Sequence, residues 1–149
     1  MVKIFLDTNV AIDLLAKREP FYEDSKLFLM LAQGSLAQLF IAESSLGNLY
    51  YLVFQVYKIP QANVLLEQFF LVFEVISGGK DVIIQSLNSN FKDKEDGLQY
   101  YTALAHRVDF LITRNKRDFI GNSQIPILTP QGLKKAPPRK LARLMAKQY

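Results

Sequence analysis

Short apolar runs alternate with amphipathic stretches along most of this chain. Five apolar runs predict β-strands at residues 2–6, 38–41, 72–76, 109–112 and 125–128. Apolar residues three and four apart predict helices over residues 21–33, 44–57, 61–70 and 96–106. Gly34 is a natural C-cap for the first of these helices, and Pro60 separates the second from the third. In the last helix, the pattern predicts one apolar face made of Leu98, Tyr101, Leu104 and Ala105.

This alternation of strands and helices indicates an α/β fold. Strands joined by helices favour a parallel sheet with both faces covered. We therefore expect a three-layer α/β/α sandwich with a central, mainly parallel five-stranded sheet. The pattern extends over residues 1–133 as one domain and leaves residues 134–149 as a separate tail.

The length and composition of the chain exclude several classes of protein. The chain has 149 residues, enough for one domain with a substantial core. It contains no cysteine, which excludes disulfides, thiolate metal sites and thiol nucleophiles. Its longest apolar runs fall well short of the roughly 20 residues that span a bilayer. We expect a cytoplasmic protein with no membrane contact.

Charge is distributed unevenly between the domain and the tail. Residues 1–133 hold 12 basic and 14 acidic side chains, a net charge of −2, whereas residues 134–149 hold six basic and no acidic ones. A basic tail is often only a solvated end of the chain, and it is less often a contact for nucleic acid or a partner. After Pro137-Pro138, Leu141, Leu144 and Met145 give this tail a weak helical pattern that would let it dock on the domain, a partner or RNA.

Acidic residues follow the predicted strands at positions where they can meet. Asp7 follows the first strand, Asp118 follows the fourth, and Asp93 and Asp96 open the helix between them. Each has a plain structural interpretation: Asp7, Thr8 or Asn9 can cap a helix, and acids in a first turn face the helix dipole. In an open α/β sheet, however, the carboxyl ends of the strands form the ligand site, so we expect these acids to converge.

Convergent carboxylates without basic partners repel one another by energies on the order of kcal/mol. A hard cation offsets this repulsion, and oxygen ligands with several retained waters suit Mg²⁺ or Mn²⁺. Such an ion activates water and stabilises charge on a phosphodiester. The acids therefore favour metal-dependent phosphodiester hydrolysis.

Four segments, in order, resemble motifs of PIN domains. They are the opening segment 3–10 with Asp13, the acidic segment 93–99, the closing segment 109–119 and the exit 127–130. The resemblance implies an endoribonuclease that binds Mg²⁺ or Mn²⁺ through Asp7, Asp96 and Asp118, with Asp93 as an additional ligand. It implies that Asn9, Thr113 and Asn115 shape the site, Thr113 by a hydrogen bond to a carboxylate or to a water on the metal.

The resemblance also implies biological partners. Small stand-alone PIN domains are commonly VapC-type toxins, so it implies RNA as substrate, an antitoxin that blocks the acidic cleft, and a homodimer. Arg114, Lys116 and Arg117 flank the expected site and would contact RNA phosphates, although such clusters are often only solvated charge.

One position departs from the family pattern. The family usually has a Glu on the helix after the second strand, where this chain has Asn48. Asn48 can shape the site through a neutral oxygen but adds no charge. An alternative function is therefore a catalytically weak or inactive PIN domain that binds RNA or protein.

Other residues carry less information. His106 is the only histidine, which argues against histidine-based acid–base chemistry and favours a surface role. Tyr50, Tyr51, Phe54 and Tyr57 favour a core or dimer contact over a base-stacking platform. A phosphoacceptor domain is disfavoured, because Ser77-Gly78-Gly79 follows the third strand where a receiver needs an acceptor Asp, and a dehalogenase-type site needs Asp at position 9.

Overall fold

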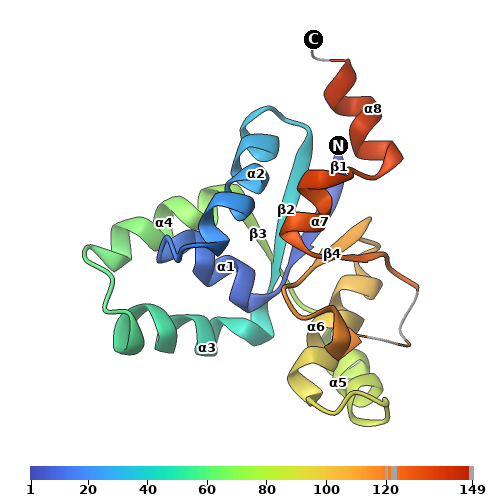
Figure 1. Ribbon diagram of the computed structural model, residues 1–149. Coiled ribbons are helices and arrows are strands. Elements are labelled where there is room, and N and C mark those ends of the chain that lie inside the picture. Colours follow the sequence, from blue (N-terminus) through green and yellow to red (C-terminus); the bar gives the residue numbers. More distant parts are fainter. Residues whose placement is uncertain (120, 122–123, 148–149) are drawn as a thin grey trace.

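The computed structural model describes residues 1–119, 121 and 124–147, and its core is a parallel five-stranded sheet (Figure 1). The strands are β1 (Val2–Leu6), β2 (Ala37–Ala42), β3 (Phe73–Ile76), β4 (Phe110–Ile112) and β5 (Ile127–Leu128), in the order β3-β2-β1-β4-β5. All four pairings are parallel. The strand order reverses at β1, so the ligand site of this fold is expected beyond the ends of β1 and β4.

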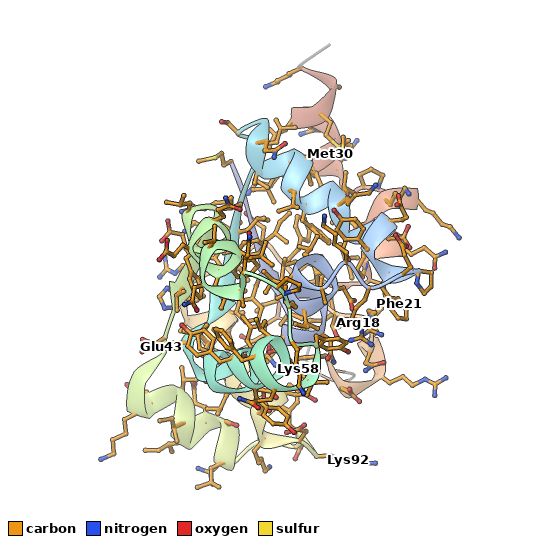
Figure 2. The ribbon with its side chains drawn as sticks, turned by 90° about the vertical axis from the view of Figure 1, so that its left-hand side faces the viewer. Arg18, Phe21, Met30, Glu43, Lys58 and Lys92 are labelled. Atoms are coloured by element: carbon orange, nitrogen blue, oxygen red, sulfur yellow. The ribbon has the colours of Figure 1, made fainter. Side chains whose placement is uncertain are left out.

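Helices cover both faces of the sheet, which confirms the predicted three-layer α/β/α fold. They are α1 (Thr8–Leu15), α2 (Phe21–Gln33), α3 (Leu46–Tyr50), α4 (Ala62–Val72), α5 (Gly79–Leu87), α6 (Lys94–Ala105), α7 (Pro130–Lys135) and α8 (Arg139–Ala146). One core contains Ile4 and Leu6 of β1 with side chains of α1, α2 and α4, and the other contains Phe5 with side chains of α6. Alternate residues of β1 thus face opposite layers. Figure 2 views the molecule from the side on which α2, α3 and α4 lie.

The predicted strands and helices overlap elements of the structure, but α7 was not predicted and two further elements differ. The helix expected over residues 44–57 consists of a 3₁₀ turn (Glu43–Ser45), α3 and a π-helical segment (Tyr51–Val56). Helix α5 was not predicted, because its exposed face carries the apolar residues Ile83, Ile84 and Leu87, which obscure the helical period.

The predicted apolar face of α6 is wrong. Its buried residues are Gly97, Gln99, Tyr100, Thr102 and Ala103, whereas Leu98, Tyr101 and Leu104 are only half-buried and Ala105 is exposed. The reason is that α6 packs against both the sheet and α5, so small and polar residues face the closest contacts. Tyr100 and Phe91 pack together within this layer, with ring centroids 5.5 Å apart.

The basic tail is folded onto the domain as far as residue 147; residues 148 and 149 lie outside the described part of the chain. Leu141 of α8 is fully buried, and Leu144 and Met145 pack against the same core. The Lys140 Nζ lies 2.8 Å from Asp109 Oδ1. Helix α8 therefore lies beside the start of β1, at the opposite end of that strand from Asp7 (Figure 1).

Candidate active site

Asp7 lies directly after β1, beside the end of β4. Leu6 pairs with Ile112, so the next residues in each strand, Asp7 and Thr113, are neighbours. The Thr113 hydroxyl donates a hydrogen bond of 2.8 Å to Asp7 Oδ2. Although Asp7 occupies the N-cap position of α1, its side chain makes no capping hydrogen bond. Among the hydrogen bonds that lower the pKa of Asp7, the one from Thr113 after the neighbouring strand is the largest.

The side chain of Asp7 is largely shielded from solvent. Its side chain is 6% exposed, and this burial raises the pKa of the carboxyl group. Hydrogen bonds from Thr113 and from the amide of Gln99 oppose the rise in pKa. Gln99 is 2% exposed, and its Oε1 has no hydrogen-bond partner among the described residues. Sequence reasoning missed Gln99, although its position three residues after Asp96, on the same side of α6, was a usable signal.

Helix α6 brings two further carboxylates to this edge of the sheet. Asp93 is its N-cap, and Asp93 Oδ1 accepts a hydrogen bond of 2.9 Å from the backbone N–H of Glu95. The structural role expected for an acid at this position is thus present. Burial raises the pKa of Asp96 to about 7, and the charges of Asp93, Asp7, Asp118 and Glu95 add to this rise. Burial likewise raises the pKa of Glu95, an acid that sequence reasoning did not single out.

Asp118 completes the group from a third element. It lies on a 3₁₀ turn (Lys116–Phe119) that follows β4. A cavity of about 440 Å³ is lined by Asp93, Asp96 and Asp118 together with Asn90, Phe91, Lys92 and Arg117. Three of the four predicted acids therefore share one cavity, and the fourth, Asp7, is near enough to raise the pKa of Asp96.

Other predicted site residues lie around this group. Asn115 donates its backbone N–H to Thr113 Oγ1 at 3.1 Å, so it fixes the hydroxyl that holds Asp7. Asn9 and Lys116 are exposed, and Arg117 reaches the acidic cavity. Asn48 is exposed on α3 and is not among the described residues that line the acidic cavity. His106 is exposed, as predicted, with Nε2 2.7 Å from the carbonyl oxygen of Ser77.

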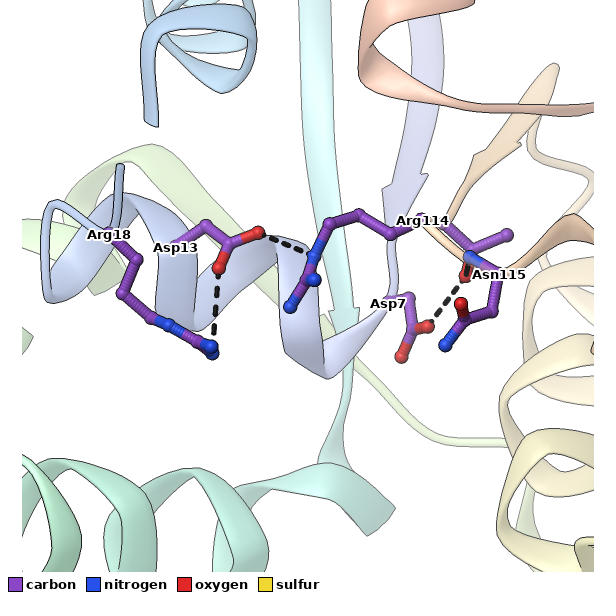
Figure 3. A network of polar contacts seen from close by, with 6 residues as sticks. Asp7, Asp13, Arg18, Arg114 and Asn115 are labelled. Atoms are coloured by element: carbon purple, nitrogen blue, oxygen red, sulfur yellow. Dashed lines mark hydrogen bonds and ion pairs between the residues drawn. The ribbon is translucent and has the colours of Figure 1, made fainter. Parts of the chain in front are cut away.

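Arg114 is held by a buried ion pair (Figure 3). Asp13 is fully buried, with Oδ2 2.9 Å from Arg114 Nε and Oδ1 3.6 Å from a terminal nitrogen of Arg18. Burial raises the pKa of Asp13, and both arginines oppose that rise. The guanidinium carbon of Arg114 lies 3.9 Å from the centre of the Phe21 ring. This network was not recognised in the sequence, because its members are far apart along the chain.

The oxygen atoms of these side chains are of the kind that binds a hard divalent cation, but in the described part of the chain they do not form a complete set of ligands. All the donors are carboxylate or amide oxygens, which a hard cation prefers. Burial, and after it the charge of the neighbouring carboxylates, raises the pKa of Asp96 to about 7. Within the described residues, no three Asp, Glu or His side chains are close enough to form a complete metal site. Magnesium is often held through one or two carboxylates with several retained waters, and this arrangement fits that mode of binding.

One comparison with known proteins identifies a family, and another identifies a solved structure of similar fold. The model of a family described as the PIN domain matches residues 3–117. The fold is similar to a chain in the crystal structure of VapBC2 from Rickettsia felis bound to a DNA fragment from their promoter. That match has a TM-score of 0.64 and 20% sequence identity, and it covers 86% of this chain and 98% of that chain. No curated protein matches the sequence. Across the described part of the chain, no helix has the length and apolar character needed to cross a membrane.

Proposed function

The chain belongs to the PIN-domain family, and from this premise we propose that it is a metal-dependent endoribonuclease, the toxin of a toxin–antitoxin pair. The observation that carries the proposal is the pKa of Asp96. This pKa rises to about 7 because burial and four neighbouring carboxylates all disfavour the ionised form. Since such crowding costs stability, its presence at the ligand edge of an α/β sheet supports a role in binding a cation.

The cation would be held by Asp96 and Asp118, with Asp7 and Asp93 adding ligands or negative charge. The Thr113 hydroxyl donates to Asp7 Oδ2 and Gln99 also hydrogen-bonds this carboxylate, so both residues would position Asp7 beside the cation. The backbone of Glu95 occupies Asp93 Oδ1, which leaves Oδ2. When bound, Mg²⁺ or Mn²⁺ would lower the pKa of a water and offset the charge that develops on a phosphodiester.

The basic residues beside this cavity would bind the substrate. Arg117 lines the cavity and Lys116 is exposed on the same 3₁₀ turn, so both can contact phosphates on either side of the scissile bond. Arg114 differs, because Asp13 neutralises its charge and Phe21 covers its guanidinium. We therefore assign phosphate contacts to Lys116 and Arg117.

The test is RNA cleavage by the purified chain. A mixed RNA pool is incubated with Mg²⁺, Mn²⁺ or EDTA, with the wild type and the Asp7→Asn and Asp118→Asn variants. Asp81→Asn on α5 is the matched control, because Asp81 is exposed and lies outside the acidic cavity. We expect cleavage with metal only, a loss of at least a hundredfold in the two site variants, and full activity in the control. Equal activity of all four proteins, or cleavage in EDTA, would refute the proposal.

A second candidate function is a non-catalytic module that binds RNA or protein. Asn48 favours it, because the usual Glu is absent and the described residues form no complete three-ligand site. Asn48→Glu discriminates between the two functions. If the wild type cleaves no RNA with either metal and the variant does, the chain is a degenerate nuclease. If neither protein cleaves RNA, the binding function is favoured.

Two protein partners are part of the proposal. A chain of the VapBC2 complex has this fold, and by analogy an antitoxin would place a basic side chain in the acidic cavity.

A homodimer would cover the aromatic residues Tyr50, Tyr51, Phe54 and Tyr57, which are 37–59% exposed on α3 and the π-helical segment and at the segment's C-cap. Sedimentation of the wild type beside Tyr51→Lys tests the dimer: a monomeric variant is expected, and an unchanged assembly would exclude this surface.

A further inference from the structure

A second cavity lies beside the acidic one, and none of the roles above accounts for it. It measures about 450 Å³ and is lined by Pro20, Phe21 and Asp24 of the α2 region, Arg114 and Asn115 after β4, and Thr129, Pro130 and Gln131 at the start of α7. A volume of this size is in the range of pockets that bind small ligands. The cavity is therefore large enough to hold one planar ring system with its substituents.

The wall of this cavity is rigid where it meets the acidic group. Arg114 is fixed by its ion pair of 2.9 Å to the buried Asp13, and it stacks on Phe21 at 3.9 Å. Asn115 is fixed through its backbone N–H, which donates to the same Thr113 hydroxyl that holds Asp7. The Arg114 side chain, held in this way, loses little conformational entropy when a ligand binds.

The cavity is close to the place where a phosphodiester would be cut. Asn115 of this cavity accepts, through its backbone carbonyl oxygen, a hydrogen bond of 3.1 Å from the backbone N–H of Asp118, which lines the acidic cavity. Residues joined in this way lie within the reach of a few nucleotides, since even a stacked strand rises by about 3.4 Å per nucleotide. The two cavities can thus bind successive parts of one strand.

The charges of the wall argue against a phosphate as the ligand. Asp13, behind the wall, balances Arg114, and the carboxylate among the lining residues, Asp24, lies 3.5 Å from Lys134. A phosphate would therefore meet no uncompensated cation among the described lining residues. An uncharged planar group that can stack on Phe21 and Arg114 fits the wall better, because aromatic faces and guanidinium planes bind bases in this way.

The polar groups of the wall also distinguish a base from an apolar side chain. The side-chain amides of Asn115 and Gln131 make no hydrogen bond with any described residue, and both side chains are exposed. Such amides pair with the donor and acceptor edges of bases, often through two hydrogen bonds. An aromatic side chain of a protein partner would leave both amides unpaired.

We infer that this cavity is a nucleobase subsite, which binds an unpaired base of single-stranded RNA next to the cleaved phosphodiester and sets the sequence preference of cleavage. Phe21 and Arg114 supply the stacking surface, and Asn115 and Gln131 read the edge of the base. The inference rests on the proposed ribonuclease function, and it adds the class of substrate and the residues that select it.

The first test measures binding without cleavage. The ¹⁵N-labelled wild type in EDTA is titrated with RNA tetranucleotides of A, C, G or U. The signals followed are the backbone amides of Phe21 and Gln131 and the Nε–H of Arg114. We expect shifts at all three groups, with an affinity at least tenfold higher for one base than for the weakest. Shifts confined to the acidic cavity, or produced by the antitoxin but by no RNA, would overturn the inference.

The second test measures cleavage of a randomised RNA pool, with the cut positions read by sequencing. Gln131→Ala should lower the base preference about tenfold, equivalent to about 1.4 kcal/mol, through slower cleavage beside the preferred base. Phe21→Leu should also lower the preference. Gln85→Ala on α5 and Phe54→Leu on the π-helical segment are the matched controls, and thermal unfolding checks that all variants fold.

These outcomes separate the two proposals. A wild type that cleaves RNA, with the same base preference in Gln131→Ala and Phe21→Leu, overturns the subsite and leaves the nuclease standing. A wild type that cleaves nothing with either metal refutes the nuclease. In that case, base-dependent shifts in the titration support the subsite in a binding module, and their absence overturns it.

Discussion

Asp96 is the acid whose removal is most informative, because its effect on stability can be worked out without any assay of activity. Its pKa is raised from 3.8 to about 7 by burial and by four neighbouring carboxylates. In the native state this group therefore holds its proton more tightly than in the unfolded chain. The sign follows from proton linkage: the contribution of Asp96 to stability is most favourable below about pH 4 and is lost as the pH rises towards 7.

The magnitude follows from the same difference. At about 1.4 kcal/mol per pH unit, the full shift corresponds to roughly 4 kcal/mol. Asp96 is only partly buried, and the water beside it screens its neighbours. We therefore expect Asp96→Asn to stabilise the metal-free protein by about 1–2 kcal/mol at pH 8, and to have little effect at pH 4.

The assay is urea unfolding at several pH values in EDTA, for the wild type, Asp96→Asn and the control Glu67→Gln. Glu67 is exposed on α4 and forms no ion pair with the described residues. The difference between wild type and variant isolates Asp96 from the other buried acids, whose protonation also changes. Mn²⁺ at 100 times its dissociation constant should stabilise the wild type by about 2.7 kcal/mol, and the variant by much less.

Two results would refute this reasoning. The first is an Asp96→Asn protein that is less stable than the wild type at pH 8 in EDTA, since the carboxylate would then be a net stabilising group. The second is an equal gain from Mn²⁺ in both proteins, because the cation would then bind elsewhere. A variant that is stabilised in EDTA and gains no stability from Mn²⁺ would show that the carboxylate which destabilises the protein is also the one that binds the cation.

Three further predictions concern the groups that hold the site and the tail. Asp13→Asn should destabilise the protein by about 3 kcal/mol in urea unfolding, because two arginines then lose their buried partner. Thr113→Val should cost about 1–3 kcal/mol, and should move the acidic limb of the cleavage profile to higher pH, because Asp7 loses the hydrogen bond that lowers its pKa. Leu141→Ala should cost about 2–4 kcal/mol, since its side chain is fully buried, whereas Lys140→Ala should cost under about 1 kcal/mol.

Each of these predictions has its own control. Asp24→Asn breaks an exposed ion pair and should change stability by less than about 1 kcal/mol, so a loss as large as that of Asp13→Asn would argue against burial as the cause. Thr113→Ser should restore both stability and pH profile, and failure to do so would assign the effect to packing. If Leu141→Ala unfolds like the wild type, α8 does not dock in solution.

The family and the fold class could be predicted from sequence because both depend on local patterns. Short apolar runs mark parallel strands buried on both faces, and this property does not depend on which strands are neighbours. The helix at residues 21–33 has the same bounds in the prediction and in the structure, since an apolar face and Gly34 define it. The face of α6 was mispredicted because that helix packs on two sides, and a single apolar stripe does not describe such a helix.

By itself, the sequence determined which residues carry charge and on which elements they lie. Asp7 and Asp118 follow strands, and Asp93 and Asp96 open a helix; the general topology of parallel sheets then brings them to one edge. Only the tertiary structure decided their partners. Thr113 meets Asp7 through the register of β1 and β4, and Asp13 meets Arg114 across about 100 residues of chain. Desolvation, hydrogen bonding and ion pairing act through distance in space, which a linear sequence does not contain.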